Sequence, residues 1–174
     1  MPRVLPAALL LALGLVAPAA AQDAAAVARA DRAAVAAERE VTAALAQRSL
    51  TSEEREFAAC PPLGVHHERW RDAGGVTRLY RTDQGSDDSR VATAQYYDGA
   101  GRLRLVIVEA AAVNGTALRD RIVIDDAGRR VRESRRRISG PGYTFPARWP
   151  DDLLVRTPDR SFASNDPCGR PAPR

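Results

Sequence analysis

The chain has 174 residues and a net charge of +4, from 26 basic and 22 acidic side chains, and all of its basic residues are arginine. This length suits one ordinary domain with its own hydrophobic core. A charge this small does not by itself indicate a nucleic-acid-binding protein. Apart from the N-terminal stretch, which is discussed next, no part of the sequence is apolar enough to cross a bilayer.

The first residues have the layout of a secretory signal peptide. Arg3 supplies a positive charge, an apolar stretch follows over residues 7–17, and residues 19–21 are alanines that fit the small-residue cleavage pattern. A membrane-spanning helix needs about 20 apolar residues, and this stretch is shorter and is flanked by prolines. We therefore expect residues 1–21 to be removed, which leaves residues 22–174 as a single exported domain in the periplasm or outside the cell.

The two cysteines, Cys60 and Cys168, lie far apart in the sequence. An even number of cysteines in an exported chain indicates a disulfide, because the compartments outside the cytoplasm are oxidising. Closing a loop of this size stabilises the folded state by roughly 4–5 kcal/mol in the chain-entropy model. The alternative is two free thiols or a catalytic cysteine, but neither cysteine has a neighbouring base that would activate it. We expect a Cys60–Cys168 bond.

Two helices are predicted after the signal peptide. Asp23 can cap a helix over about residues 24–48. Its apolar residues recur at spacings of three and four and form a narrow stripe of mostly small side chains, namely Val27, Ala30, Ala34, Ala37, Val41 and Leu45. Thr51 and Glu54 form a capping box, which predicts a second, short helix over about residues 51–59.

Repeated turn signals divide the following sequence into short strands. Asp72, Asp98 and Asp125 each begin a four-residue segment that ends in glycine, a pattern typical of a type I turn followed by a bulge. Asn114-Gly115 is the signal for a two-residue hairpin loop. We therefore expect six strands in a mostly antiparallel meander, at about residues 65–71, 76–82, 89–97, 102–113, 116–124 and 129–138.

The C-terminal region is irregular and rich in proline. It contains too many apolar side chains for a disordered tail, namely Tyr143, Phe145, Trp149, Leu153, Leu154, Val155 and Phe162. We expect this region to cover the sheet as a lid. The predicted fold class is therefore α+β, with two N-terminal helices packed on a six-stranded sheet and an irregular C-terminal lid.

A two-residue loop at Asn114-Gly115 also predicts which residues face each other across that hairpin. It places Glu109 directly opposite Asp120 on the more apolar face. Two close carboxylates split their pKa values, so this pair is the candidate for general acid–base catalysis. The structural alternative is an ion-pair cluster in which Arg132 and Arg136 lie diagonally from Asp120.

Six arginines crowd the last predicted strand, within residues 129–137. As a functional feature they would form a strip that binds an anionic partner, with Arg130, Arg132, Arg135, Arg136 and Arg137 as the candidates. The exported location and the lack of aromatic residues interleaved with them argue against nucleic acid. The alternative is that a charged outer strand protects the sheet edge from pairing with other molecules.

No residue pattern indicates a metal or a cofactor. His66 and His67 are adjacent, so on a strand they point to opposite faces and cannot share a metal ion. We expect an exported, non-enzymatic binding or interaction domain of unknown ligand and without a cofactor, for which a protein or an anionic glycan is a candidate partner. The alternatives are a hydrolase-like enzyme that uses Glu109 and Asp120, and a structural component of the cell envelope.

Overall fold

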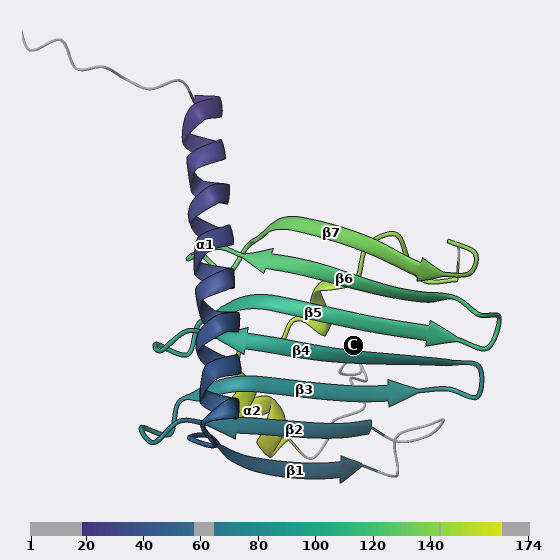
Figure 1. Ribbon diagram of the computed structural model, residues 1–174, viewed down its shortest axis with the longest axis horizontal. Coiled ribbons are helices and arrows are strands. Elements are labelled where there is room, and N and C mark those ends of the chain that lie inside the picture. The colour runs from purple at the N-terminus through teal and green to yellow at the C-terminus, as the bar shows by residue number, and fades with distance from the viewer. Residues whose placement is uncertain (1–18, 58–64, 143, 165–174) are drawn as a thin grey trace, which may run out of the picture.

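A seven-stranded antiparallel sheet forms the centre of the molecule, with a long helix on one face and a C-terminal segment on the other (Figure 1). The computed structural model describes residues 19–57, 65–142 and 144–164. The elements are α1 (Ala19–Ala46), β1 (Thr51–Phe57), β2 (Val65–Arg71), β3 (Thr77–Gly85), β4 (Ser89–Tyr97), β5 (Leu103–Ala112), β6 (Ala117–Ile124), β7 (Arg130–Ser139), η1 (Asp151–Leu153) and α2 (Pro158–Ala163). Within the described residues, no helix is both long enough and apolar enough to span a membrane.

The strands follow chain order across the sheet, so each one pairs with its neighbours in the sequence. The six predicted strands correspond to β2–β7, and the prediction of an α+β fold with an antiparallel meander is confirmed. The turns that begin at Asp72, Asp98 and Asp125 share one geometry, in which the aspartate N–H donates to the carbonyl four residues later. The glycine that ends each turn has a positive φ and donates to the aspartate carbonyl. Each turn therefore forms as its local sequence predicts.

The predicted second helix is wrong, because residues 51–57 form β1, and residues 58 and 59 lie outside the described residues. The capping box of Thr51 and Glu54 is a local signal worth about 1 kcal/mol. In the folded chain the same segment pairs with β2 along its whole length, with Glu54 opposite Glu68. The short helix would have no tertiary partner for most of its residues, whereas the strand gains a ladder of backbone hydrogen bonds and cross-strand contacts.

The register of the β5–β6 hairpin also differs from the prediction. Its turn is longer than the predicted two-residue loop, because the N–H of Ala112 donates to the carbonyl of Thr116, as in the other turns. This length shifts the pairing by one residue, so that Glu109 lies opposite Arg119. Side chains alternate between the two faces of a sheet, so the same shift places Glu109 and Asp120 on opposite faces.

Helix α1 packs on the sheet through the predicted stripe of small residues. Ala30 and Ala34 are buried against Leu105, Ile107 and Val123. Small side chains allow the helix to approach the strands closely, which a stripe of large residues would prevent. The helix lies across one end of the strands and leaves the rest of this face uncovered (Figure 1).

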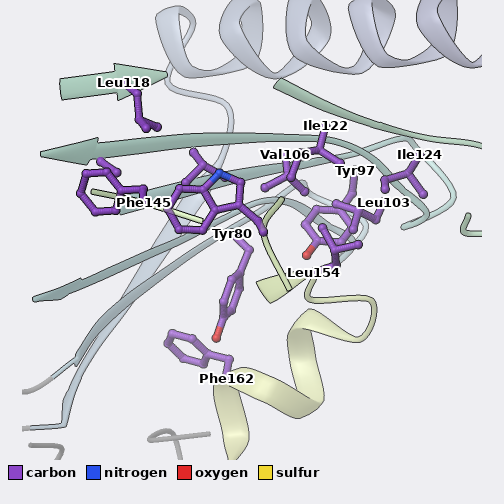
Figure 2. Close-up of a cluster of buried hydrophobic side chains, with 13 residues drawn as sticks. Tyr80, Tyr97, Leu103, Val106, Leu118, Ile122, Ile124, Phe145, Leu154 and Phe162 are labelled. Carbon is purple, nitrogen blue, oxygen red and sulfur yellow. The ribbon is translucent and has the colours of Figure 1, made fainter. Parts of the chain in front are cut away.

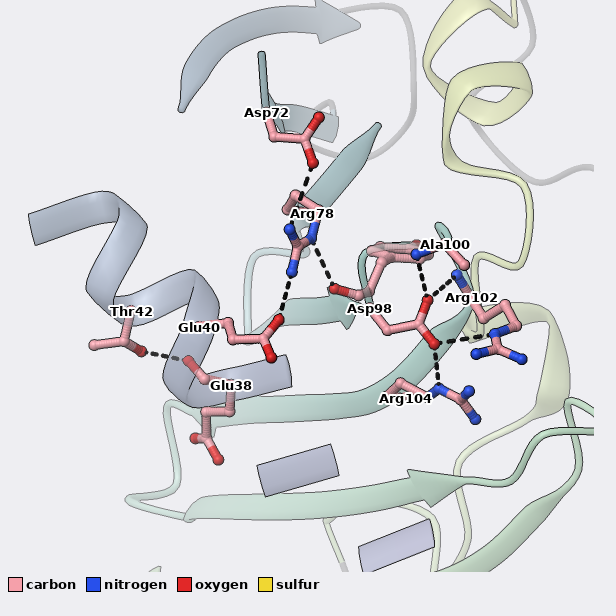
Figure 3. Close-up of polar contacts among 10 residues, drawn as sticks. Glu38, Glu40, Thr42, Asp72, Arg78, Asp98, Ala100, Arg102 and Arg104 are labelled. Atoms are coloured by element: carbon pink, nitrogen blue, oxygen red, sulfur yellow. Dashed lines mark hydrogen bonds and ion pairs between the residues drawn. The ribbon is translucent and has the colours of Figure 1, made fainter. Parts of the chain in front are cut away.

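Ion pairs connect α1 to the strands beneath it. They join Glu40 to Arg78 at 2.8 Å (Figure 3), Glu38 to Arg121 at 2.7 Å and Asp31 to Arg132 at 2.6 Å. Arg78 also reaches Asp72 in the β2–β3 turn, at 3.4 Å. Exposed ion pairs contribute at most about 1 kcal/mol each, so their main effect is to orient the helix on the sheet.

The opposite face is covered by the lid, which comprises residues 144–164 and contains η1 and α2. Its apolar side chains join the main hydrophobic core with those of the sheet (Figure 2). The core residues from the lid are Phe145, Trp149, Leu154 and Phe162, and the largest from the sheet are Tyr80, Tyr97, Leu103, Ile122 and Ile124. The Tyr97 hydroxyl also donates to the carbonyl of Val155 at 2.6 Å. A segment with little regular secondary structure is thus held by both packing and hydrogen bonds.

Candidate functional site

A cavity of about 560 Å³ lies between the lid and strands β2–β4. The sheet contributes His67, Tyr80, Thr82, Val91 and Thr93, and the lid contributes Trp149, Pro150, Leu153 and Val155. The side chains of β5 that face the lid are apolar, whereas β2–β4 also present the polar side chains of His67, Thr82 and Thr93 to the cavity. Its volume falls in the range of about 300–1,000 Å³ that is typical of sites for small molecules.

One wall of the cavity is a hydrogen-bonded pair of aromatic side chains. His67 of β2 and Tyr80 of β3 are both buried, and the His67 Nδ1 atom lies 2.9 Å from the Tyr80 hydroxyl oxygen. Burial lowers the pKa of His67 to about 4, assisted by the positive charges of His66 and Arg55. Burial also raises the pKa of Tyr80 to about 12. At neutral pH the pair is uncharged, so it supplies hydrogen bonds to the cavity rather than a charge.

A second set of polar groups lies on the floor of the cavity. The Thr82 and Thr93 hydroxyl oxygens are 2.8 Å apart, on neighbouring strands. Gln95 lies two residues beyond Thr93 on the same face and is fully buried. Its side-chain amide donates to the carbonyl of Leu153 and accepts from the N–H of Val155, so it ties the floor of the cavity to the lid.

The lining of the cavity is almost free of formal charge. Asp152, which is exposed, is the one acidic side chain among the described lining residues, and no arginine is among them. An anionic ligand buried here would lose its hydration without gaining an ion pair, which is strongly unfavourable. A cation could pair only with Asp152, which is exposed to solvent, where such a pair contributes little. The site can therefore enclose a neutral molecule and position it with a few hydrogen bonds.

The predicted carboxylate pair is not formed. Glu109 is exposed on the face that carries α1, where its Oε1 atom lies 3.6 Å from Arg119. Asp120 is only 1% exposed on the lid face. There the Arg135 guanidinium donates to both Asp120 oxygens, at 2.6–3.0 Å, and the Trp149 indole N–H donates at 2.6 Å. The Asp120 side chain therefore fastens the lid to β6 and does not pair with Glu109.

The predicted arginine strip is divided between the two faces of β7. Arg130 pairs with Glu133 and Asp151, Arg135 pairs with Asp120, and both face the lid, whereas Arg132 pairs with Asp31 of α1. Arg136 and Arg137 are exposed and form no ion pair within the residues described by the structure. The expected diagonal contact of Arg132 with Asp120 is wrong, because a bulge between Val123 and Ile124 shifts the register and brings Arg135 opposite Asp120.

One group of side chains has the donor types of a metal site. Glu54, His66 and Glu68 lie on the uncovered face of β1 and β2, with their ligand atoms all within 4.8 Å of one another. Burial and the neighbouring Glu54 carboxylate raise the pKa of Glu68. Arg81 lies 3.7 Å from Glu68 and supplies a counter-charge from the protein itself. His67 points to the other face, which is the alternation predicted from the adjacency of the two histidines.

The predicted disulfide concerns residues that the structure does not describe, because Cys60 and Cys168 both lie outside the described ranges. The described residues contain no cysteine, so the bond stays a prediction from the sequence.

The cavity residues were not predicted as a site from the sequence. The signal that points to them is the alternation of polar side chains with strand spacing, in Tyr80 and Thr82 on one strand and in Thr93 and Gln95 on the next. Such residues are expected on a solvent-exposed face, and here they face a lid. Placing them under the lid requires the strand register and the path of residues 144–164, neither of which is a local property.

The described residues form an α+β domain with a largely uncharged cavity between the sheet and the C-terminal lid. Comparison with known proteins finds no match, either to a protein family, to a curated protein sequence or to a solved structure.

Proposed function

We propose that the chain is an exported binding domain that holds a small, uncharged and largely apolar molecule in the cavity under the lid. The observation that carries this proposal is the cavity itself, with a volume of about 560 Å³, apolar walls and a few buried polar groups. Export is supported by the N-terminal signal sequence alone.

A binding role is favoured over acid–base catalysis by the protonation of the buried pair in the cavity. The lowered pKa of His67 and the raised pKa of Tyr80 keep both groups neutral near pH 7. A general acid or base works best when its pKa lies near the working pH. The hydrolase alternative loses its support, because Glu109 and Asp120 lie on opposite faces of the sheet. An anionic glycan is also disfavoured at this site, since no arginine is among the described residues that line it.

The experiment that tests the proposal is binding of two uncharged fluorescent probes, Nile red and the hydrocarbon diphenylhexatriene, to the mature protein. Val91 lines the cavity, and Ala92 is the next residue on the same strand but faces the other side of the sheet. The Val91→Trp variant fills the cavity, so we expect it to weaken the binding of both probes at least about tenfold, a loss of about 1.4 kcal/mol. Ala92→Trp is the matched control and should bind both probes like the parent.

Thermal unfolding of both tryptophan variants establishes that they are folded. Binding of neither probe to the parent protein would contradict the proposal, as would equal binding by the parent and the Val91→Trp variant. Competition by the anionic dye anilinonaphthalene sulfonate with equal affinity would contradict the preference for an uncharged ligand.

A further inference from the structure

A row of hydrogen bonds beneath the cavity begins at the lid, where the Gln95 side chain contacts two backbone groups. Gln95 is 0% exposed, and the backbone N–H of Val155 donates to its Oε1 atom at 2.8 Å. A backbone N–H can only donate, so this contact identifies the Gln95 oxygen. The other end of the amide is therefore the Nε2 group, which donates to the carbonyl of Leu153 at 2.9 Å.

The same Nε2 group determines the role of Thr93. It carries two hydrogens, and it lies 3.4 Å from the Thr93 hydroxyl oxygen, which accepts the second. The Thr93 side chain is buried, and a buried hydroxyl hydrogen needs an acceptor. Among the residues that the structure describes, the acceptor in reach is the Thr82 hydroxyl oxygen, at 2.8 Å. Thr93 is the more buried of the two hydroxyls, so we assign it as the donor and Thr82 as the acceptor.

In this arrangement the hydrogen of the Thr82 hydroxyl has no acceptor among the residues that the structure describes. Thr82 is half-buried and lines the cavity. Its oxygen accepts from Thr93, so its own hydrogen is available to donate to a molecule in the cavity. A matching ligand must present an acceptor at this point. Because no positive charge lines the cavity among the described residues, the acceptor is best supplied by a neutral oxygen and not by a carboxylate.

We infer that the cavity selects a neutral carbonyl compound, such as a ketone, quinone, ester or amide with an apolar body, whose carbonyl oxygen accepts a hydrogen bond from Thr82. The inference rests on the proposed function and adds the chemical class of the ligand. Thr82 is the specificity-determining residue, and Gln95 acts through Thr93 to direct its hydrogen toward the cavity.

The same two probes test the inference, because Nile red carries a carbonyl group and diphenylhexatriene has no hydrogen-bond acceptor. Thr82→Val keeps the shape of the side chain and removes the hydroxyl. We expect this variant to bind Nile red about fivefold more weakly, as one neutral hydrogen bond predicts, with the Nile red emission moved to shorter wavelength. Binding of diphenylhexatriene should not weaken. Thr82→Ser keeps the hydroxyl and should restore both the affinity for Nile red and its emission.

The matched control is Asp83→Asn, on the residue next to Thr82 that faces the other side of the sheet. Unchanged Nile red affinity and emission in Thr82→Val would overturn the inference. The proposed function would still stand in that case if Val91→Trp blocks both probes. Weaker binding of both probes by Thr82→Val would also overturn it, because a general disturbance of the cavity does not distinguish a carbonyl acceptor from a hydrocarbon.

Discussion

His66 and His67 are neighbours in the sequence but have different environments, because adjacent residues of β2 face opposite sides of the sheet. His66 lies beside two glutamates on the uncovered face. His67 is 7% exposed under the lid, between the rings of Phe57 and Tyr80. A buried imidazole surrounded by aromatic rings is stable only in its neutral form, so this histidine makes the stability of the domain dependent on pH.

The folded state should become less stable as the pH falls, in part through His67. Its pKa is about 4 in the folded protein and about 6.5 in the unfolded chain. The unfolded state therefore binds more protons between these values, and the stabilisation is complete above pH 6.5 and lost as the pH falls toward 4. We expect the parent to lose about 3 kcal/mol relative to His67→Gln between pH 8 and pH 4. Denaturant unfolding of both proteins at several pH values measures this difference, and parallel pH profiles would show that His67 titrates normally.

Asp120 connects three parts of the molecule through one buried carboxylate. Replacing it with asparagine leaves Arg135 without its ion pair and weakens the bond to the Trp149 indole. We expect Asp120→Asn to cost about 3 kcal/mol of stability, the lower end for breaking a buried pair, because Arg135 is partly exposed. Glu109→Gln is the control for the exposed carboxylate and should change stability by less than about 1 kcal/mol. Similar losses in the two variants, measured by denaturant unfolding, would contradict the assignment of Asp120 as the anchor of the lid.

At the scale of elements, the hairpins depend on turns whose geometry is set by a few residues. Asp98 illustrates this: its side chain accepts the N–H groups of Ala100 and Arg102 and also pairs with Arg104 (Figure 3). Such a turn forms before any tertiary contact is needed, so it aligns its two strands from within the hairpin. The seven-stranded meander is largely a row of these hairpins, in which each strand meets its sequence neighbour.

The junction between β7 and the lid depends on close contact of two backbones. Gly140 follows β7 with a φ of +70°, and a Cβ atom there would lie 2.5 Å from the Thr116 backbone nitrogen and Cα. We expect Gly140→Ala to destabilise the protein by about 2–4 kcal/mol, since it adds both a clash and an unfavourable φ.

The matched control for this glycine is Gly99→Ala, at a turn glycine where a Cβ would meet no atom within 4 Å and φ is not in the left-handed region. It should change the thermal unfolding midpoint by no more than a few degrees. If the Gly140→Ala variant were as stable as the Gly99→Ala variant, this would contradict the close contact between the β7–lid junction and the β5–β6 turn.

At the scale of the whole molecule, the first strand and the end of the lid are joined although they are distant in sequence. The Arg55 guanidinium donates to the carbonyl of Phe162 and, at 3.3 Å, to that of Ser164. Cys60 follows Arg55 by five residues and Cys168 follows Ser164 by four. An extended chain spans about 3.3–3.6 Å per residue, so a bond between the two cysteines is compatible with these contacts.

The Cys60–Cys168 bond therefore remains our prediction for the exported protein. Mass spectrometry of the mature protein under non-reducing conditions should give a mass two hydrogens below that of the reduced chain. Reduction should then lower stability by roughly 4–5 kcal/mol, through the greater entropy of the unfolded chain. Two cysteines that react with an alkylating agent in the native exported protein would refute the bond.

The sequence alone determined the parts of this protein whose causes are local. The three Asp-x-x-Gly turns, the stripe of small residues on α1 and the alternating strands of β2–β7 are each decided within a few residues.

Tertiary structure decided the rest. β1 is a strand because β2 is available to pair with it, against a local helix signal. Asp120 meets Arg135 because a bulge shifts the β6–β7 register by a single position, and it is separated from Glu109 because the β5–β6 register is shifted by one position. The cavity belongs wholly to this second group: its polar groups come from three strands and its roof from residues about 60 positions away, as in the Gln95–Val155 bond. Only the folded chain brings such groups together, because no short stretch of sequence contains both halves of the site.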